Sequence, residues 1–139
     1  MTNNNNTAAA ISAADRITIR TAAQGAVALV AYAGAAGSPH KIATHGSLAF
    51  GSATGLVGHV LAVKKNDVKL DYTSSASLAD QVFPALTASV ALLAKQAPGE
   101  EENFRATVTT AVQAAARAAG EPTPPVTAML AKIDGALAA

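Results

Sequence analysis

The chain contains no cysteine and no tryptophan, and only 14% of its 139 residues are charged. Without cysteine it has no disulfides, no thiolate metal ligands and no cysteine nucleophile. Roughly 25% of the residues are charged in typical soluble domains. Because so few charges oppose contact between molecules, a surface of this kind favours self-association.

Basic residues are also too few and too scattered for a nucleic-acid surface. The formal net charge is +1, and the one cluster, Lys64, Lys65 and Lys69, is interrupted by Asp67 and flanked by Asp71. Binding to phosphates requires several cations on one face. We therefore expect no nucleic-acid partner.

Alanine supplies about a quarter of the chain, whereas aromatic residues make up only 4%. Alanine is the best helix former, but it buries little area, so its helices must pack closely. A chain of this length forms one ordinary domain. We expect an all-α, single-domain bundle of five or six alanine-rich helices over residues 7–139, preceded by a disordered polar tail at residues 1–6.

Helix boundaries follow from capping residues, glycines and prolines. An irregular or short extended connection is expected near residues 64–76, where Val68, Leu70 and Tyr72 alternate with polar residues. The expected helices cover about 8 or 12 to 33, 39–49, 53–64, 77–97, 100–119 and 124–139.

The first of these helices shows two features. Ser12 and Asp15 resemble a capping box, and Arg16, Arg20 and Gln24 recur every four residues, which predicts one solvated stripe. Residues 25–36 carry no polar side chain except the hydroxyl of Tyr32. This segment is expected to be buried on all sides or to lie at a contact between subunits.

The second half of the chain carries its own signals. Ser77 and Asp80 predict a helix start, and Pro84 should kink that helix or mark its true beginning. Residues 100–102 are three glutamates that favour the positive end of the next helix, with Glu101 expected to pair with Arg105. The predicted core consists of Ile17, Val27, Leu29, Val30, Phe50, Leu56, Val60, Leu61, Phe83, Leu86, Val90, Leu93, Phe104, Val108, Val112, Met129, Leu130 and Ile133.

Residues able to carry chemistry are few. The candidates are Ser38, His40, Lys41, His45 and His59. Residues 38–41 match Ser-x-x-Lys, a nucleophile pattern of some acyl-transferring enzymes, although a helix cap before a proline explains the serine better. The histidines are five and fourteen residues apart with no carboxylate between them, which differs from the usual metal-ligand spacing. We expect no metal and no cofactor.

Two stretches, 21–40 and 42–63, lack Asp, Glu, Lys and Arg and have the length of a membrane span. Both are rich in Gly, Ser, Thr and His, so insertion would be marginal. The polar, Asn-rich start does not resemble a secretory signal. We therefore expect a soluble, cytoplasmic protein with no membrane partner.

Three functions remain open from the sequence. The first is a non-enzymatic interaction or self-assembling module whose partner is a second copy, as a homo-oligomer, or another protein. The second is a binder of a small apolar ligand between helices. The third is an enzyme that uses the His40/His45/His59 region.

Overall fold

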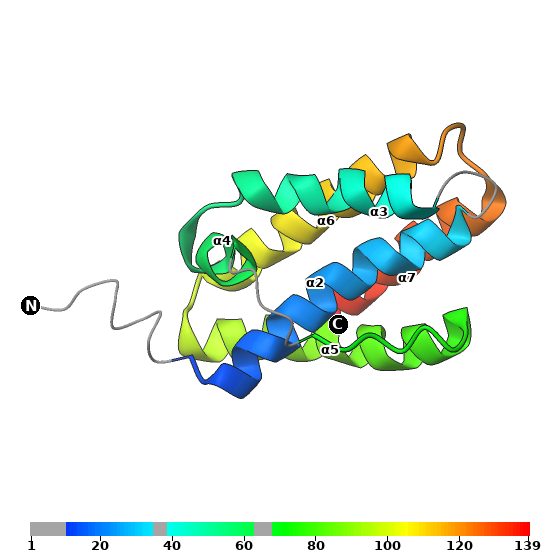
Figure 1. The fold of residues 1–139 in the computed structure, drawn as a ribbon. Helices are drawn as coiled ribbons and strands as arrows, with labels where there is room; N and C mark the ends of the chain where they lie inside the picture. Colours follow the sequence, from blue (N-terminus) through cyan, green and yellow to red (C-terminus); the bar gives the residue numbers. More distant parts are fainter. Residues whose placement is uncertain (1–10, 35–38, 63–67) are drawn as a thin grey trace, which may run out of the picture.

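The computed structural model describes the chain except for residues 1–10, 35–38 and 63–67 and the side chains of residues 39–41 and 45. The expected tail at residues 1–6 lies outside the described residues. Those described form six α-helices, one 3-10 helix and no strand, which confirms the all-α prediction (Figure 1). The elements are α2 (Ala13–Ala33), α3 (Pro39–Leu48), η1 (Ala49–Ser52), α4 (Gly55–Ala62), α5 (Ser75–Gln96), α6 (Glu100–Ala118) and α7 (Pro124–Ala138).

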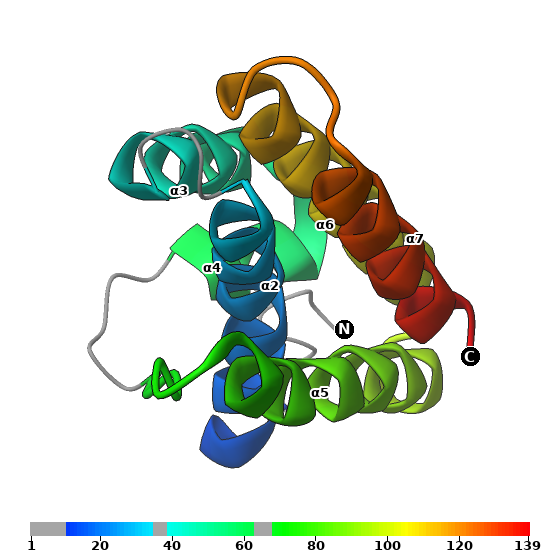
Figure 2. The ribbon, with the colours of Figure 1, turned by 90° about the vertical axis from the view of Figure 1, so that its right-hand side faces the viewer.

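Helix α2 runs through the middle of the bundle, in contact with α3, α4, α5, α6 and α7 (Figure 2). Residues 25–31 are all buried, because neighbouring helices cover α2 from every side. Of the expected buried segment 25–36, Tyr32 is instead exposed, and residues 35–36 lie outside the described part. The apolar stretch is therefore core of its own chain rather than a contact between subunits.

The solvated stripe expected on α2 is wrong at Arg20. Its side chain is only 2% exposed, and its Nη1 donates a hydrogen bond to the carbonyl oxygen of Val60 at 3.4 Å. Val60 lies in the last turn of α4, where helix carbonyls lack partners within the helix. The crossing of α4 over α2 thus buries an arginine whose position in the sequence looks like surface.

Helix caps follow the sequence in one case and depart from it in another. Ser12 Oγ accepts a hydrogen bond from the Asp15 amide at 3.0 Å, as expected. In α5 the cap is Ser74 rather than Ser77, since Ser74 Oγ accepts from the Ser77 amide at 3.0 Å. The helix then continues through Pro84, because apolar side chains on either side of the proline are buried in the core.

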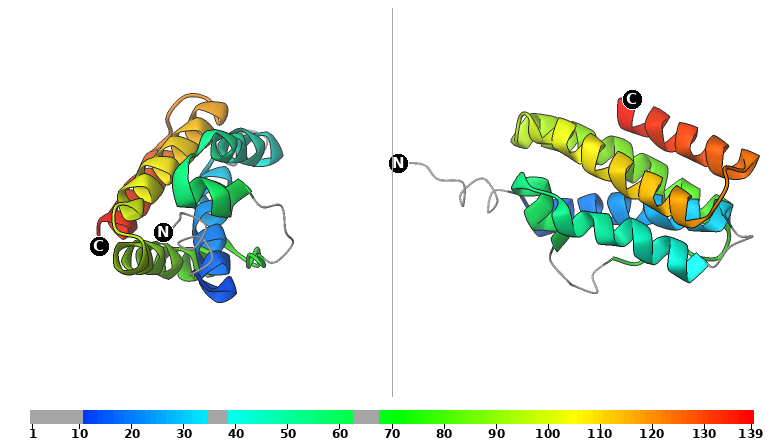
Figure 3. Two further views of the ribbon diagram at one scale, coloured as in Figure 1. Left: turned by 90° about the vertical axis from the view of Figure 1, so that its left-hand side faces the viewer. Right: turned by 90° about the horizontal axis from the view of Figure 1, so that it is seen from above.

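The prediction for α6 holds for its apolar stripe and fails for its ion pair. Phe104, Val108, Val112 and Ala115 are all buried against neighbouring helices, and α3 runs alongside (Figure 3). Arg105, however, forms its ion pair with Glu102 instead of Glu101. The Glu101 carboxylate instead accepts a hydrogen bond from the Gly99 amide at 2.7 Å, in the turn that precedes the helix.

Most of the predicted core residues are buried. Four of them, Leu56, Phe83, Met129 and Leu130, are only partly buried and pack against the core. Ile17 is also partly exposed, whereas Ile19 is completely buried. The helical period identified the inward face on most helices, but on α2 the centre is filled by Ile19 instead of Ile17.

The connection before α5 has neither helix nor strand over residues 68–74, and residues 63–67 lie outside the described part. Gln81 holds it by two hydrogen bonds. Its Oε1 accepts from the Asp71 amide at 2.8 Å, and its Nε2 donates to the Lys69 carbonyl at 2.7 Å. The Gln81 side chain of α5 therefore makes the backbone hydrogen bonds that a neighbouring strand would make to an extended segment.

Candidate functional site

The five residues considered for catalysis or metal binding give no assembled site in the described part of the chain. Ser38 lies outside it, and so do the side chains of His40, Lys41 and His45, although their backbone forms the start and middle of α3. His59 is exposed on α4. Among the described residues there is no group of three or more His, Asp or Glu side chains placed to hold a metal ion.

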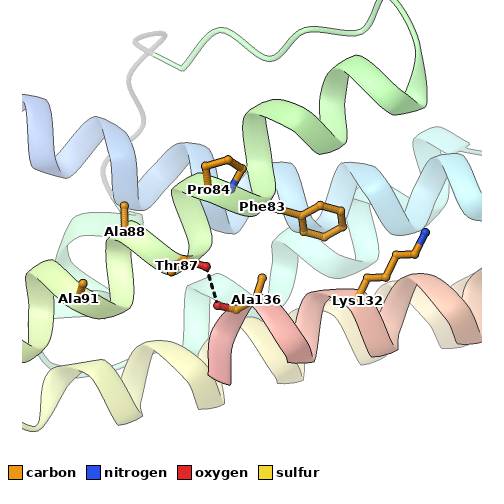
Figure 4. Close-up of a pocket in the computed structure, with 7 residues that line it drawn as sticks. All are labelled: Phe83, Pro84, Thr87, Ala88, Ala91, Lys132 and Ala136. Carbon is orange, nitrogen blue, oxygen red and sulfur yellow. Dashed lines mark hydrogen bonds between the residues drawn. The ribbon is translucent and has the colours of Figure 1, made fainter. Parts of the chain in front are cut away.

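One concave surface lies between α5 and α7. It is an open groove of about 870 Å³, formed by seven residues of which six carry no charge. Phe83 and Lys132 lie at one end and Ala91 at the other (Figure 4). The lining residues are Phe83, Pro84, Thr87, Ala88, Ala91, Lys132 and Ala136.

One polar contact fixes the floor of this groove. Thr87 Oγ1 donates a hydrogen bond to the Ala136 carbonyl oxygen at 2.9 Å, joining the middle of α5 to the end of α7 (Figure 4). The opposite side of α5 is held by Leu86 and Val90, both buried in the core. The side of α5 that faces the groove therefore belongs to a helix whose opposite side is fixed in the core.

Helix α5 is apolar over most of its length, and small residues on its outer side, among them Pro84, Ala88 and Ala91, are exposed. By length and composition it is the one described helix apolar enough to cross a membrane, yet only 33% of that 18-residue window is buried. One such helix is weak evidence for a membrane. The stretch 42–63, considered above as a span, is divided among short helices, and none of them reaches the ~20 residues that a span requires.

A second concave surface, a cleft of about 500 Å³, lies among α2, α3, η1, α4 and the connection that contains Leu70 and Tyr72. None of its described lining residues is charged. Gln24 and Ser47 supply polar side chains, and the rest of the wall is mainly apolar. The lining consists of Gln24, Val27, Ala28, Ala43, Ser47, Leu48, Phe50, Gly51, Leu61, Ala62, Leu70 and Tyr72.

The exposed large apolar side chains of the described chain gather at this cleft. Leu48 and Tyr72 line it and are 68% and 57% exposed. Tyr32, 38% exposed, has its ring centre 6.1 Å from that of Tyr72, and its hydroxyl donates to the Tyr72 carbonyl oxygen at 3.1 Å. Burial raises the pKa of the Tyr72 phenol above its ordinary value, and the neighbouring Tyr32 adds to the shift.

Comparisons with protein-family models, with curated proteins and with solved structures found no match to this chain.

The sequence contained a signal for the groove that its helical period alone does not reveal. Between Asp80 and Lys95 the α5 sequence has no charged residue, so both faces of the helix are uncharged and mainly apolar over almost four turns. A helix of this kind is buried on all sides or needs a partner. The cleft has no comparable signal, because α2, α3 and α4 meet there only through the tertiary fold.

Proposed function

We propose that this protein is a non-enzymatic interaction module, and that the groove between α5 and α7 is the surface by which it holds a helical partner. The observation that carries the proposal is the outer face of α5, which is uncharged between its ends, held in place by the buried side of the helix, and exposed at Pro84, Ala88 and Ala91. Apolar faces that remain exposed and contiguous mark contact sites in soluble proteins.

The shape and chemistry of the groove favour a helix as its occupant. Grooves between helices accept the apolar face of an amphipathic helix, whose anchors recur every three or four residues. Small side chains at Ala88 and Ala91 let a second backbone approach closely, while Phe83 offers a larger apolar contact at one end. Lys132 lies at the rim of the groove, at the same end as Phe83.

A designed amphipathic peptide of leucine, alanine, glutamate and lysine tests this proposal. Added to the 15N-labelled protein at low concentration, it should shift backbone amide signals of α5 and α7. The variant Ala88→Glu should weaken binding at least tenfold, because a carboxylate without a partner would be buried under the peptide. Ala106→Glu on the exposed side of α6 is the matched control and should bind like the original chain. Shifts confined to other helices, or equal binding by both variants, would count against the groove.

The cleft supports a second function, the binding of a small, neutral, mainly apolar molecule. Its volume falls within the range of ligand pockets, and such pockets combine apolar walls with a few polar groups. Gln24 and Ser47 supply those groups. Because no charged side chain is among the described lining residues, an ionised ligand would lose its hydration without gaining a counter-charge.

The two tyrosines make this second function measurable, since the chain has no tryptophan, Tyr72 lines the cleft and Tyr32 lies beside Tyr72. We expect the neutral dye N-phenyl-1-naphthylamine to bind and to quench tyrosine emission, and its sulfonated analogue to bind more weakly. Gly51→Leu should block binding because a side chain there enters open space on the cleft wall. Gly135→Leu, also in open space but on α7, is the control. Equal binding of both dyes, or by both variants, would refute this ligand site.

We also propose that the protein acts in the cytoplasm. Of the described helices only α5 has the length and composition of a span, and the groove proposal gives its apolar face a protein partner. Fractionation of cells that express the chain should place it in the soluble fraction, and recovery with membranes would overturn this assignment.

A further inference from the structure

The two charged residues of α5 stand at opposite ends of its exposed face. Asp80 and Lys95 are both exposed and lie 15 residues apart, a distance of ~22 Å along a helix. With 3.6 residues per turn, Pro84, Ala88 and Ala91 fall in the same stripe between them. The outer face therefore has an acidic end, an uncharged middle and a basic end.

Neither charge is used within the described part of the chain. Asp80 and Lys95 make no hydrogen bond or ion pair with another described residue. A stripe with opposite charges at its two ends is complementary to its own copy when that copy runs in the opposite direction.

We propose that the partner of the groove is a second copy of this chain, with the two α5 helices packed antiparallel about a two-fold axis between Thr87 and Ala88. This arrangement places Asp80 of each protomer opposite Lys95 of its partner, and Pro84 opposite Ala91. A two-fold axis repeats every contact, so the dimer contains two ion pairs at its rim. The inference rests on the groove being an interaction surface.

Packing and electrostatics both favour this orientation. Small residues at the centre of the stripe allow the helix axes to approach to the ~8–10 Å of packed helices. A parallel arrangement would place Asp80 opposite Asp80 and Lys95 opposite Lys95, and like charges in contact are unfavourable. One helix face is smaller than the ~800 Å² per partner of stable complexes, so the dimer should dissociate in the micromolar range or above.

Charge reversal tests the pairing directly. Asp80→Lys or Lys95→Asp alone converts both ion pairs into repulsive contacts, which should raise the dissociation constant about 30-fold. The double variant restores both pairs with their signs exchanged and should return to within about threefold of the original. Asp134→Lys, an equal change of charge at an exposed position of α7 outside the groove lining, should leave the constant unchanged.

The two single variants mixed in equal amounts give the sharpest result. One carries two cations on its stripe and the other two anions, so native mass spectrometry should show mainly the mixed dimer. Circular dichroism confirms that each variant is folded. A dimer that ignores the reversals, or a double variant that is not restored, would overturn the antiparallel pairing. A strict monomer that still binds the designed peptide in its groove would overturn the second-copy proposal alone, and loss of both would overturn the groove as well.

Discussion

Adding a single methyl group at Gly25 should destabilise the bundle, although glycine is a poor helix former. Gly25 lies in the middle of α2, where α5 crosses it. A Cβ atom there would lie 2.3 Å from Val82 Cγ2 and 3.2 Å from Val82 Cγ1. Real Cβ atoms do not approach so closely, so either the Val82 side chain or the spacing of the two helices must change.

The size of the effect follows from two opposing terms. Replacing glycine by alanine within a helix stabilises it by up to ~1 kcal/mol. Overpacking a closed core costs about 1–3 kcal/mol, and Val82 is completely buried. We expect Gly25→Ala to lower the free energy of unfolding by about 1–2 kcal/mol.

Urea unfolding followed by circular dichroism measures this change, and Gly135→Ala supplies the control. Gly135 lies in α7 with nothing within 4 Å of its added Cβ, so that variant should be more stable by about 0.5–1 kcal/mol. Val82→Ala opens space for the new methyl group, and the double variant with Gly25→Ala should lose about 1–2 kcal/mol less than the sum of the two single changes. Strict additivity, or equal stabilisation at both glycines, would refute close packing of α2 on α5.

Three further predictions concern α5 and the tyrosines. Ser89 Oγ is buried without a hydrogen-bond partner among the described residues. Ser89→Ala should therefore increase the free energy of unfolding by ~1 kcal/mol and raise the urea midpoint. A loss of stability would show that the hydroxyl has a partner. Pro84→Ala restores a helix amide, and even after the greater flexibility of the unfolded chain is subtracted it should increase the free energy of unfolding by about 1–2 kcal/mol and so raise the melting temperature. An unchanged melting curve would argue against a helix through residue 84. The raised pKa of Tyr72 means that its neutral form stabilises the folded state below pH ~10, and that this contribution is lost as the pH rises through the folded pKa. Absorbance at 295 nm should therefore show a late tyrosine transition that Tyr72→Phe removes, and a single transition at the ordinary value would contradict the partial burial of this ring beside Tyr32.

Features set by nearest neighbours along the chain were predictable from the sequence. Ser12 caps α2 and Gly120 follows the end of α6 with a positive φ of 102°, because caps and stops depend on three or four consecutive residues. The apolar stripe of α6 was predictable for the same reason. These local rules sufficed for the helical class and for most helix boundaries.

Features set by contacts distant in sequence were not predictable. Arg20 has the spacing of a surface residue, and only the passage of α4 over α2 buries it against Val60. The groove depends on which side of α5 receives α7, and the cleft depends on three helices meeting around Tyr72. Sequence period tells which face is apolar, but it does not tell which apolar face another element covers.

The native mass of the protein over a range of concentrations tests the central proposal most directly, with Ala88→Glu and Ala106→Glu measured beside it. The account predicts that a species of twice the 13.8 kDa chain mass grows with concentration, disappears in Ala88→Glu and persists in Ala106→Glu. A single chain mass at every concentration, or a dimer that Ala88→Glu leaves intact, would contradict it.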